Sequence, residues 1–308
     1  MEVLKIRRRM AETVNREAHE LYVATTCYNL GGFYLAQDRY SNAEKYYLKA
    51  LEIYNHLPKS VSREAYELNM AMTSGNLGFI YEKQDRINKA EKFYLEALEI
   101  YHHLAETTNG KMFELEVADL CHSLGVLYAV NDRSADAEKK YFEALKICHR
   151  LSKKVNREVY MPIMAEIYKS LGCLYLLDER SENADNLYLE ALDMYCCLAE
   201  TVNQEKYEPS VEDTAVVCCN VVSLYARIGK PEDATRFYLK VMEMLRRLAK
   251  TLNREKYEVM MAVVTLNMYK LYLKPDADKA RTFLNKAKKI ARRYKHVNPI
   301  CKQIWEQE

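Results

Sequence analysis

Six small polar residues recur along the chain, and their side chains carry groups that could bind a peptide. Asn29 and Asn76 stand about 47 residues apart, and asparagine or serine follows at similar intervals. The asparagine amide is both donor and acceptor, so a row of such groups can pair with the backbone of an extended peptide. We name this predicted row the ladder, and its members are Asn29, Asn76, Ser123, Ser170, Asn220 and Asn267.

Residues next to the ladder would select the bound peptide. They are of mixed type, and Phe79, Val126 and Tyr28 favour a ligand with some apolar side chains. We predict peptide-binding roles for Tyr28, Phe79, His122, Lys169 and Lys270. Two simpler interpretations stay open: the ladder is a set of solvated polar residues, and the aromatic residues support helix packing.

Histidine and cysteine also recur, near the ends of successive predicted helices, and invite a metal-site interpretation. The residues are His56, His102, His103, Cys148, His149, Cys196 and Cys197. Neighbouring helix axes pack about 8–10 Å apart, whereas zinc requires ligands at about 2.0–2.3 Å. We therefore predict no metal site and no cofactor. The sequence also lacks GxSxG, P-loop and HExxH motifs, which favours a protein without enzymatic activity.

A repeated pair of helices must position these residues. Leu30, Gly31 and Tyr34 recur about every 47 residues, and so do Ala43 and Tyr47. Both groups have helical spacing, so each repeat contains a first and a second helix, each with one apolar stripe. Glycine inside a helix costs about 1 kcal/mol relative to alanine. We therefore predict a close approach of the two helices at Gly31, Gly78, Gly125 and Gly172.

This order of residues resembles the tetratricopeptide repeat family, which has a small pair in its first helix and alanine, an aromatic residue and alanine in its second. The usual repeat is near 34 residues, and this one is about 13 longer. The long repeats are similar to those of kinesin light chain and of bacterial arrays. The resemblance implies an all-α, right-handed superhelical solenoid whose concave groove binds peptides through an asparagine ladder. It disfavours a carboxylate clamp, because consecutive repeats lack the required lysine and asparagine set.

The repeats divide the chain into successive units within a single domain, 1–308. The predicted boundaries are an unpaired second helix at 1–14, repeats at 15–61, 62–108, 109–155, 156–202, 203–252 and 253–297, and a C-terminal capping helix at 298–308. The unpaired helix leaves an apolar stripe at the N-terminal edge. We therefore expect either a longer protein, or another subunit or domain that covers this edge.

Composition favours a cytoplasmic helical protein. The 308 residues include only 8 glycines and 6 prolines, too few for the many turns of a sheet protein. The net charge of +2 gives no general electrostatic reason for binding nucleic acid or a membrane. The 9 cysteines lack CxxC spacing, so we expect free thiols.

The sequence favours a non-enzymatic scaffold that binds a protein or peptide partner of unknown identity in its groove. One alternative is a regulatory sensor that responds to a peptide, or a fragment of a larger signalling protein. Another is a structural array that forms a homo-oligomer through its N-terminal edge.

Overall fold

The computed structural model describes residues 16–57, 64–107, 113–153, 157–177, 181–228 and 230–307. Throughout these residues the regular structure is helical, which confirms the all-α prediction. The chain forms two compact units, one ending at Arg150 and the other beginning at Leu151, and each is described separately. The predicted unpaired helix at 1–14 lies outside the described residues.

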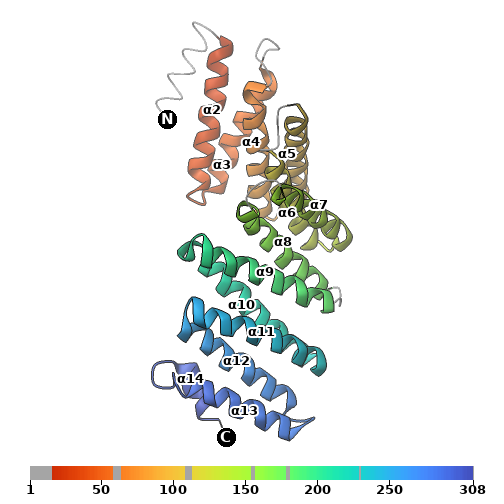
Figure 1. The fold of residues 1–308 in the computed structure, drawn as a ribbon. Helices are drawn as coiled ribbons and strands as arrows, with labels where there is room; N and C mark the ends of the chain where they lie inside the picture. The colour runs from red at the N-terminus through yellow and green to blue at the C-terminus, as the bar shows by residue number, and fades with distance from the viewer. Residues whose placement is uncertain are drawn as a thin grey trace. The chain divides into compact units, whose positions relative to one another are not determined.

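The first unit consists of antiparallel helix pairs, coloured red to yellow-green in Figure 1. Each pair joins the first and second helices of one repeat through a short turn. In chain order the helices are α2 (Arg16–Leu35), α3 (Tyr40–His56), α4 (Glu64–Lys83), α5 (Ile87–Thr107), α6 (Glu114–Ala129) and α7 (Ser134–Ser152).

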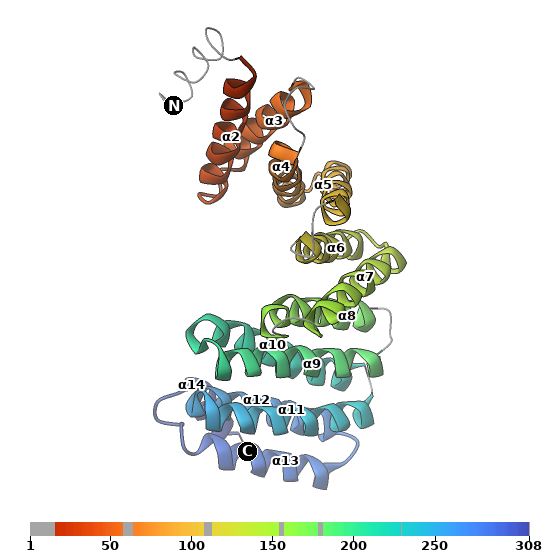
Figure 2. The same cartoon turned by 45° about the horizontal axis from the view of Figure 1, so that its top comes forward.

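The second unit repeats this arrangement and ends in an additional short helix. After the 3₁₀ turn η2 (Arg157–Val159) come α8 (Met161–Leu177), α9 (Ser181–Thr201), α10 (Gln204–Arg227), α11 (Pro231–Thr251), α12 (Arg254–Tyr272), α13 (Ala277–Ala291) and α14 (Pro299–Trp305). Figure 2 shows α14 beside α12 and α13, both of which it contacts. Cys301 and Ile304 of α14 are buried in one apolar cluster with Leu266 and Leu284.

Within each pair of the first unit, a glycine of the first helix lies against a tyrosine ring of the second. A methyl group added at Gly31 would lie 2.6 Å from Cδ1 of Tyr47, and one added at Gly125 would lie 2.5 Å from Cε1 of Tyr141. Real carbon atoms do not approach this closely, so no larger residue fits without moving the ring. The two helices therefore approach closely at the repeated glycine, as the sequence predicts.

The turn between the paired helices uses aspartate in a left-handed conformation. The φ angles of Asp38, Asp85 and Asp132 are 54°, 57° and 57°. Aspartate tolerates this region better than most residues because its short polar side chain can hydrogen-bond locally. The turns between the paired helices therefore do not require glycine.

Adjacent pairs are joined by a carboxylate that receives hydrogen bonds from the next repeat. Tyr81 Oη donates to Glu44 Oε1 at 3.0 Å, and Arg86 Nη1 donates to the same oxygen at 3.0 Å. One repeat later, Tyr128 and Arg133 bind Glu91 in the same way, at 2.9 Å each. The tyrosine of the first helix, the position of Tyr34 in the first repeat, therefore links one helix pair to the next.

In the second unit the corresponding carboxylate, Asp185, is buried more deeply. Its side chain accepts a hydrogen bond of 2.6 Å from Tyr225 Oη and the residue is 3% exposed. Burial raises the pKa of Asp185 to about 6, although the hydrogen bond from Tyr225 and the charge of Arg236 act in the opposite direction. Ionisation of Asp185 at neutral pH therefore lowers the free energy of unfolding.

We expect Gly78→Ala and Gly75→Ala to change stability in opposite directions. A methyl at Gly78 would overlap the buried ring of Tyr94, whereas at Gly75 the nearest atom is Leu120 Cδ2 at 3.8 Å. Gly78→Ala should lower the free energy of unfolding by about 1–3 kcal/mol, and Gly75→Ala should raise it by about 0.5–1 kcal/mol through helix propensity. Urea unfolding monitored by circular dichroism measures both, and equal effects would contradict the close contact.

We expect Asp185→Asn to stabilise the protein at neutral pH and to alter its pH dependence. A raised carboxyl pKa means that the folded state binds more protons than the unfolded state between about pH 4 and 6, so stability falls as pH rises through this window. The asparagine removes this effect while its oxygen can still accept from Tyr225. Relative to wild type, the variant should gain about 2 kcal/mol between these pH values.

Urea unfolding at both ends of this pH window measures the effect of Asp185→Asn. Glu190→Gln is the matched control, because Glu190 is exposed on the same helix. A stability difference between Asp185→Asn and wild type that does not change with pH would show that Asp185 is not held protonated by burial.

Candidate functional site

The first unit holds three ladder residues, which differ in their surroundings. Asn29 on α2 is exposed, whereas Asn76 on α4 and Ser123 on α6 are half-buried. Asn76 Nδ2 donates to Tyr47 Oη at 3.1 Å, and Ser123 Oγ donates to the Asp119 carbonyl at 3.0 Å. Asn76 therefore satisfies the hydroxyl of the tyrosine that packs on Gly31, and its amide has a structural role.

The predicted flanking residues of this unit also contact the fold. Tyr28 Oη donates to Met72 Sδ at 3.7 Å, and the Tyr28 ring lies 5.9 Å from that of Tyr47. The half-buried ring of His122 lies 5.8 Å from that of Tyr141. Phe79 is the most accessible of these residues, being 37% exposed. Helix packing thus accounts for part of this row, and Phe79 keeps a free surface.

The second unit holds the other ladder residues. Asn220 is exposed on α10, and Ser170 and Asn267 are half-buried on α8 and α12. Asn267 Nδ2 donates to Ser223 Oγ at 2.7 Å, so it joins α12 to α10. Lys169 forms ion pairs with Glu166 at 3.0 Å and Asp213 at 3.4 Å, and Lys270 is exposed. Of this set, Asn220 borders a cavity.

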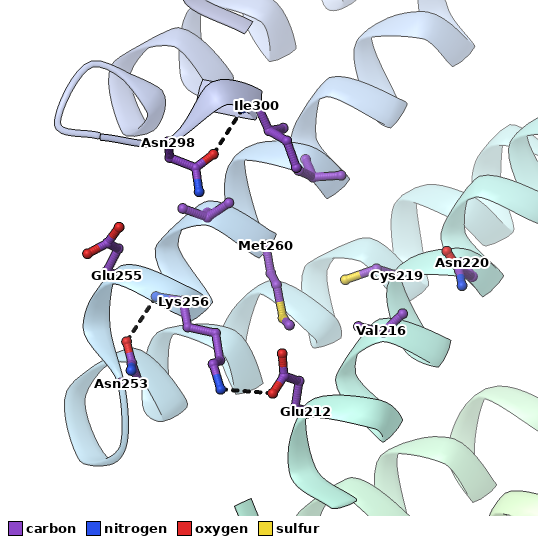
Figure 3. Close-up of a pocket in the computed structure, with 12 residues that line it drawn as sticks. Glu212, Val216, Cys219, Asn220, Asn253, Glu255, Lys256, Met260, Asn298 and Ile300 are labelled. Carbon is purple, nitrogen blue, oxygen red and sulfur yellow. Dashed lines mark hydrogen bonds and ion pairs between the residues drawn. The ribbon is translucent and has the colours of Figure 1, made fainter. Parts of the chain in front are cut away.

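That cavity is a groove between α10 and α12 that the first turn of α14 closes at one end (Figure 3). Its volume is about 460 Å³. This volume is within the range of about 300–1,000 Å³ typical of ligand sites. Apolar side chains form much of the lining, which consists of Glu212, Val216, Cys219, Asn220, Asn253, Glu255, Lys256, Val259, Met260, Val263, Asn298 and Ile300. We call this set the α10–α12 groove.

The polar residues of the α10–α12 groove are held in place by one another and by helix ends. Lys256 Nζ donates to Glu212 Oε2 at 2.8 Å, and this hydrogen bond raises the pKa of Lys256. Asn253 caps α12 by accepting from the Lys256 amide at 3.0 Å, and Asn298 caps α14 by accepting from the Ile300 amide at 3.0 Å. The groove therefore combines an apolar interior with a fixed polar border.

The sequence pattern placed Asn220 in the ladder but missed the residues that α12 and α14 contribute to the groove. Lys256, Val259 and Met260 lie well before Asn267, the ladder position of α12. The signal that could have found them is the presence of Val259, Met260 and Val263, because α12 then carries more apolar residues than one packed face requires. Asn298 and Ile300 come from the closing helix, whose docking site the repeat pattern does not specify.

The recurring histidines and cysteines have separate surroundings. His103 Nδ1 lies 2.9 Å from Glu67 Oε1, and His56 Nδ1 lies 2.7 Å from the Glu52 carbonyl. Burial raises the pKa of Cys148 and of Cys196 to about 12, so both thiols stay protonated near neutral pH. Among the described residues, no three His, Cys, Asp or Glu side chains are grouped closely enough to hold a metal ion.

Within the described ranges, no helix combines the length and apolar character needed to cross a membrane.

Comparison with known proteins identifies the repeat. Residues 22–102, which include α3 and α4, match the tetratricopeptide repeat model. Residues 22–102 carry tetratricopeptide repeats. This confirms the family interpretation, and the same pattern of Leu, Gly and Tyr continues into the later repeats, as in Leu171, Gly172 and Tyr175. No curated protein sequence matches the chain.

Several solved structures are similar to this chain. Aspartyl phosphate phosphatase F from Bacillus subtilis is 12% identical over 89% of this chain and 71% of that one, with a TM-score of 0.52. The Rap conjugation gene regulator of plasmid pLS20, solved with the Phr* peptide, is 18% identical over 96% and 72%, with a TM-score of 0.49. BtubC from P. vanneervenii is 19% identical over 96% and 89%, with a TM-score of 0.47. The similarity to aspartyl phosphate phosphatase F shows that the two chains share a fold.

We expect Asn76→Ala to destabilise the tetratricopeptide repeats while Asn29→Ala does not. Removing the Asn76 amide leaves the buried Tyr47 hydroxyl without this partner, which should lower the free energy of unfolding by about 1–2 kcal/mol. Asn29 is exposed, so its truncation should stay within about 0.5 kcal/mol. Urea unfolding of the two variants tests this. Equal stability of Asn76→Ala and wild type would show that the amide has no structural role.

Proposed function

We propose that this protein is a non-enzymatic scaffold that binds an extended segment of a partner protein in the α10–α12 groove. The observation that supports this most directly is the position of Asn220, an exposed ladder amide at the border of a partly apolar cavity of about 460 Å³. An extended segment needs both a hydrogen-bonding group for its backbone and a place for its side chains. The groove provides both, because the amide of Asn220 lies beside its apolar lining.

The chemistry of the groove defines the kind of segment it fits. Val216, Val259 and Met260 would contact an apolar side chain, and burying one such side chain contributes about 1.5–3 kcal/mol. Asn220 can pair with the adjacent peptide bond through its amide. The ion pair of Lys256 and Glu212 can exchange partners with charged groups of the segment. We therefore expect a peptide with one apolar anchor and polar flanks.

We place the protein in the cytoplasm, supported by its nine free thiols, which fit a reducing compartment. In the first unit, Asn29 and Phe79 are accessible, and we propose that they form a separate peptide-binding surface of that unit. A regulatory sensor would use the same groove, so peptide binding is the property to test first.

We expect the intact chain to retain peptides from an immobilised library of random sequences, and Val216→Arg to abolish this. Val216 is 41% exposed, so arginine should leave the core intact while placing a bulky charge in the apolar part of the groove. Asn220→Ala should weaken capture of the same peptides by about tenfold, since it removes one hydrogen bond to their backbone.

Leu239→Arg is the matched control, because Leu239 is 60% exposed on α11 and does not line the groove. It should capture the same peptides as wild type. Melting curves of all variants should coincide before binding is compared. If Val216→Arg and wild type retain the same peptides, or if wild type retains none, the groove is not the binding site.

A further inference from the structure

A second cavity in the C-terminal unit lies on a different face of α12, away from the α10–α12 groove. Its volume is about 640 Å³. It is bordered by the C-terminal part of α11, the N-terminal part of α12 and the end of α13. Its lining consists of Arg246, Ala249, Lys250, Leu252, Arg254, Glu258, Met261, Ile290 and Arg293. We call this set the basic cleft.

The charge of the basic cleft is strongly unbalanced. Four of its side chains are cationic and only one, Glu258, is anionic. This contrasts with the whole chain, in which Lys and Arg exceed Asp and Glu by only two. The imbalance is therefore local. A concave site with low-dielectric walls concentrates such a field and attracts anions.

Glu258 fixes two of the cationic side chains. It is buried, and it accepts from Arg254 Nε at 3.0 Å and from Arg293 Nη1 at 3.0 and 2.8 Å. Burial opposes ionisation of Glu258, but the hydrogen bonds from Arg293, Arg254 and Tyr294 outweigh it and lower the pKa of this carboxyl. Glu258 is therefore ionised at neutral pH and holds both guanidinium groups at the cleft.

Both arginines keep donors that Glu258 does not use. A guanidinium has five N–H donors. The contact to Glu258 involves Nε of Arg254 and Nη1 of Arg293. The side chains of these arginines are 69% and 58% exposed, so their other N–H groups are accessible to a ligand.

The other two cations supply the excess charge. Arg246 and Lys250 stand one helical turn apart on α11, and both are exposed. Within the described part of the chain, neither forms an ion pair with a carboxylate. Their charge is thus not neutralised by the protein, unlike that of Arg254 and Arg293.

We propose that the basic cleft binds a phosphate monoester dianion. Four cations and one carboxylate leave an excess of three positive charges, which a doubly charged oxyanion largely neutralises. Arginine pairs with phosphate, as with a carboxylate, through two parallel hydrogen bonds. The excess positive charge of the cleft is what favours a phosphate dianion over a carboxylate of single charge. The cleft is larger than a phosphate group, so it also has room for the molecule that carries it. Leu252, Met261 and Ile290 provide an apolar surface for that part.

Calorimetric titration of the intact chain with inorganic phosphate tests the proposal. The ionic strength is kept constant with chloride. We expect saturable binding with one site per chain and a dissociation constant on the order of 1 mM. Arg246→Gln combined with Lys250→Gln should weaken binding at least about tenfold, since each charge-assisted hydrogen bond contributes strongly to anion affinity. Both residues are exposed, so the fold should be unchanged.

The control combines Lys274→Gln with Arg281→Gln, which removes the same charge from exposed positions outside the cleft. It should bind phosphate as wild type does. Equal weakening in both double variants would show a general charge effect and overturn the proposal, as would the absence of saturation.

A further titration compares a short phosphoserine peptide with glycerol 3-phosphate. Tighter binding of the peptide supports a phosphorylated protein as the source, and tighter binding of glycerol 3-phosphate supports a small metabolite. If neither binds more tightly than chloride, the proposal fails.

Discussion

The contact between a glycine of one helix and a tyrosine ring of the next sets the geometry on which the repeats depend. At Gly31 and Tyr47 the backbone of one helix lies directly on an aromatic face of the other, with no space for a methyl group. Helices that approach this closely have little freedom to rotate or slide. The contact therefore determines which residues of the first helix face outwards, and among these are the positions available for binding.

The same tyrosine also connects one repeat to the next. Its ring packs on glycine within the pair, and its hydroxyl accepts from Asn76 of the following repeat. A second tyrosine, Tyr81, reaches back to Glu44. Packing within a pair and hydrogen bonding between pairs thus involve neighbouring residues of one short pattern. Such nearest-neighbour coupling is what stabilises a repeat array, in which each unit contacts only the adjacent ones.

The sequence was sufficient to predict the helices and their pairing, because the apolar spacing and the repeated glycine are local signals. It could not predict how the ladder residues are used. Whether an asparagine faces solvent or a neighbouring hydroxyl depends on the stacking of adjacent pairs, which brings Asn76 to Tyr47 although they are 29 positions apart. Arg293 and Glu258 are likewise 35 positions apart. The ladder therefore has mixed roles: Asn76 and Asn267 bind within the fold, whereas Asn29 and Asn220 stay accessible.

Photo-cross-linking tests most directly whether the α10–α12 groove binds an extended partner segment. A peptide retained by the protein would carry a photoreactive group in place of its apolar anchor, and mass spectrometry would locate the attachment. We expect cross-links to groove residues such as Val216 and Met260. Cross-links confined to the outer surface of α11 or α13 would contradict the claim.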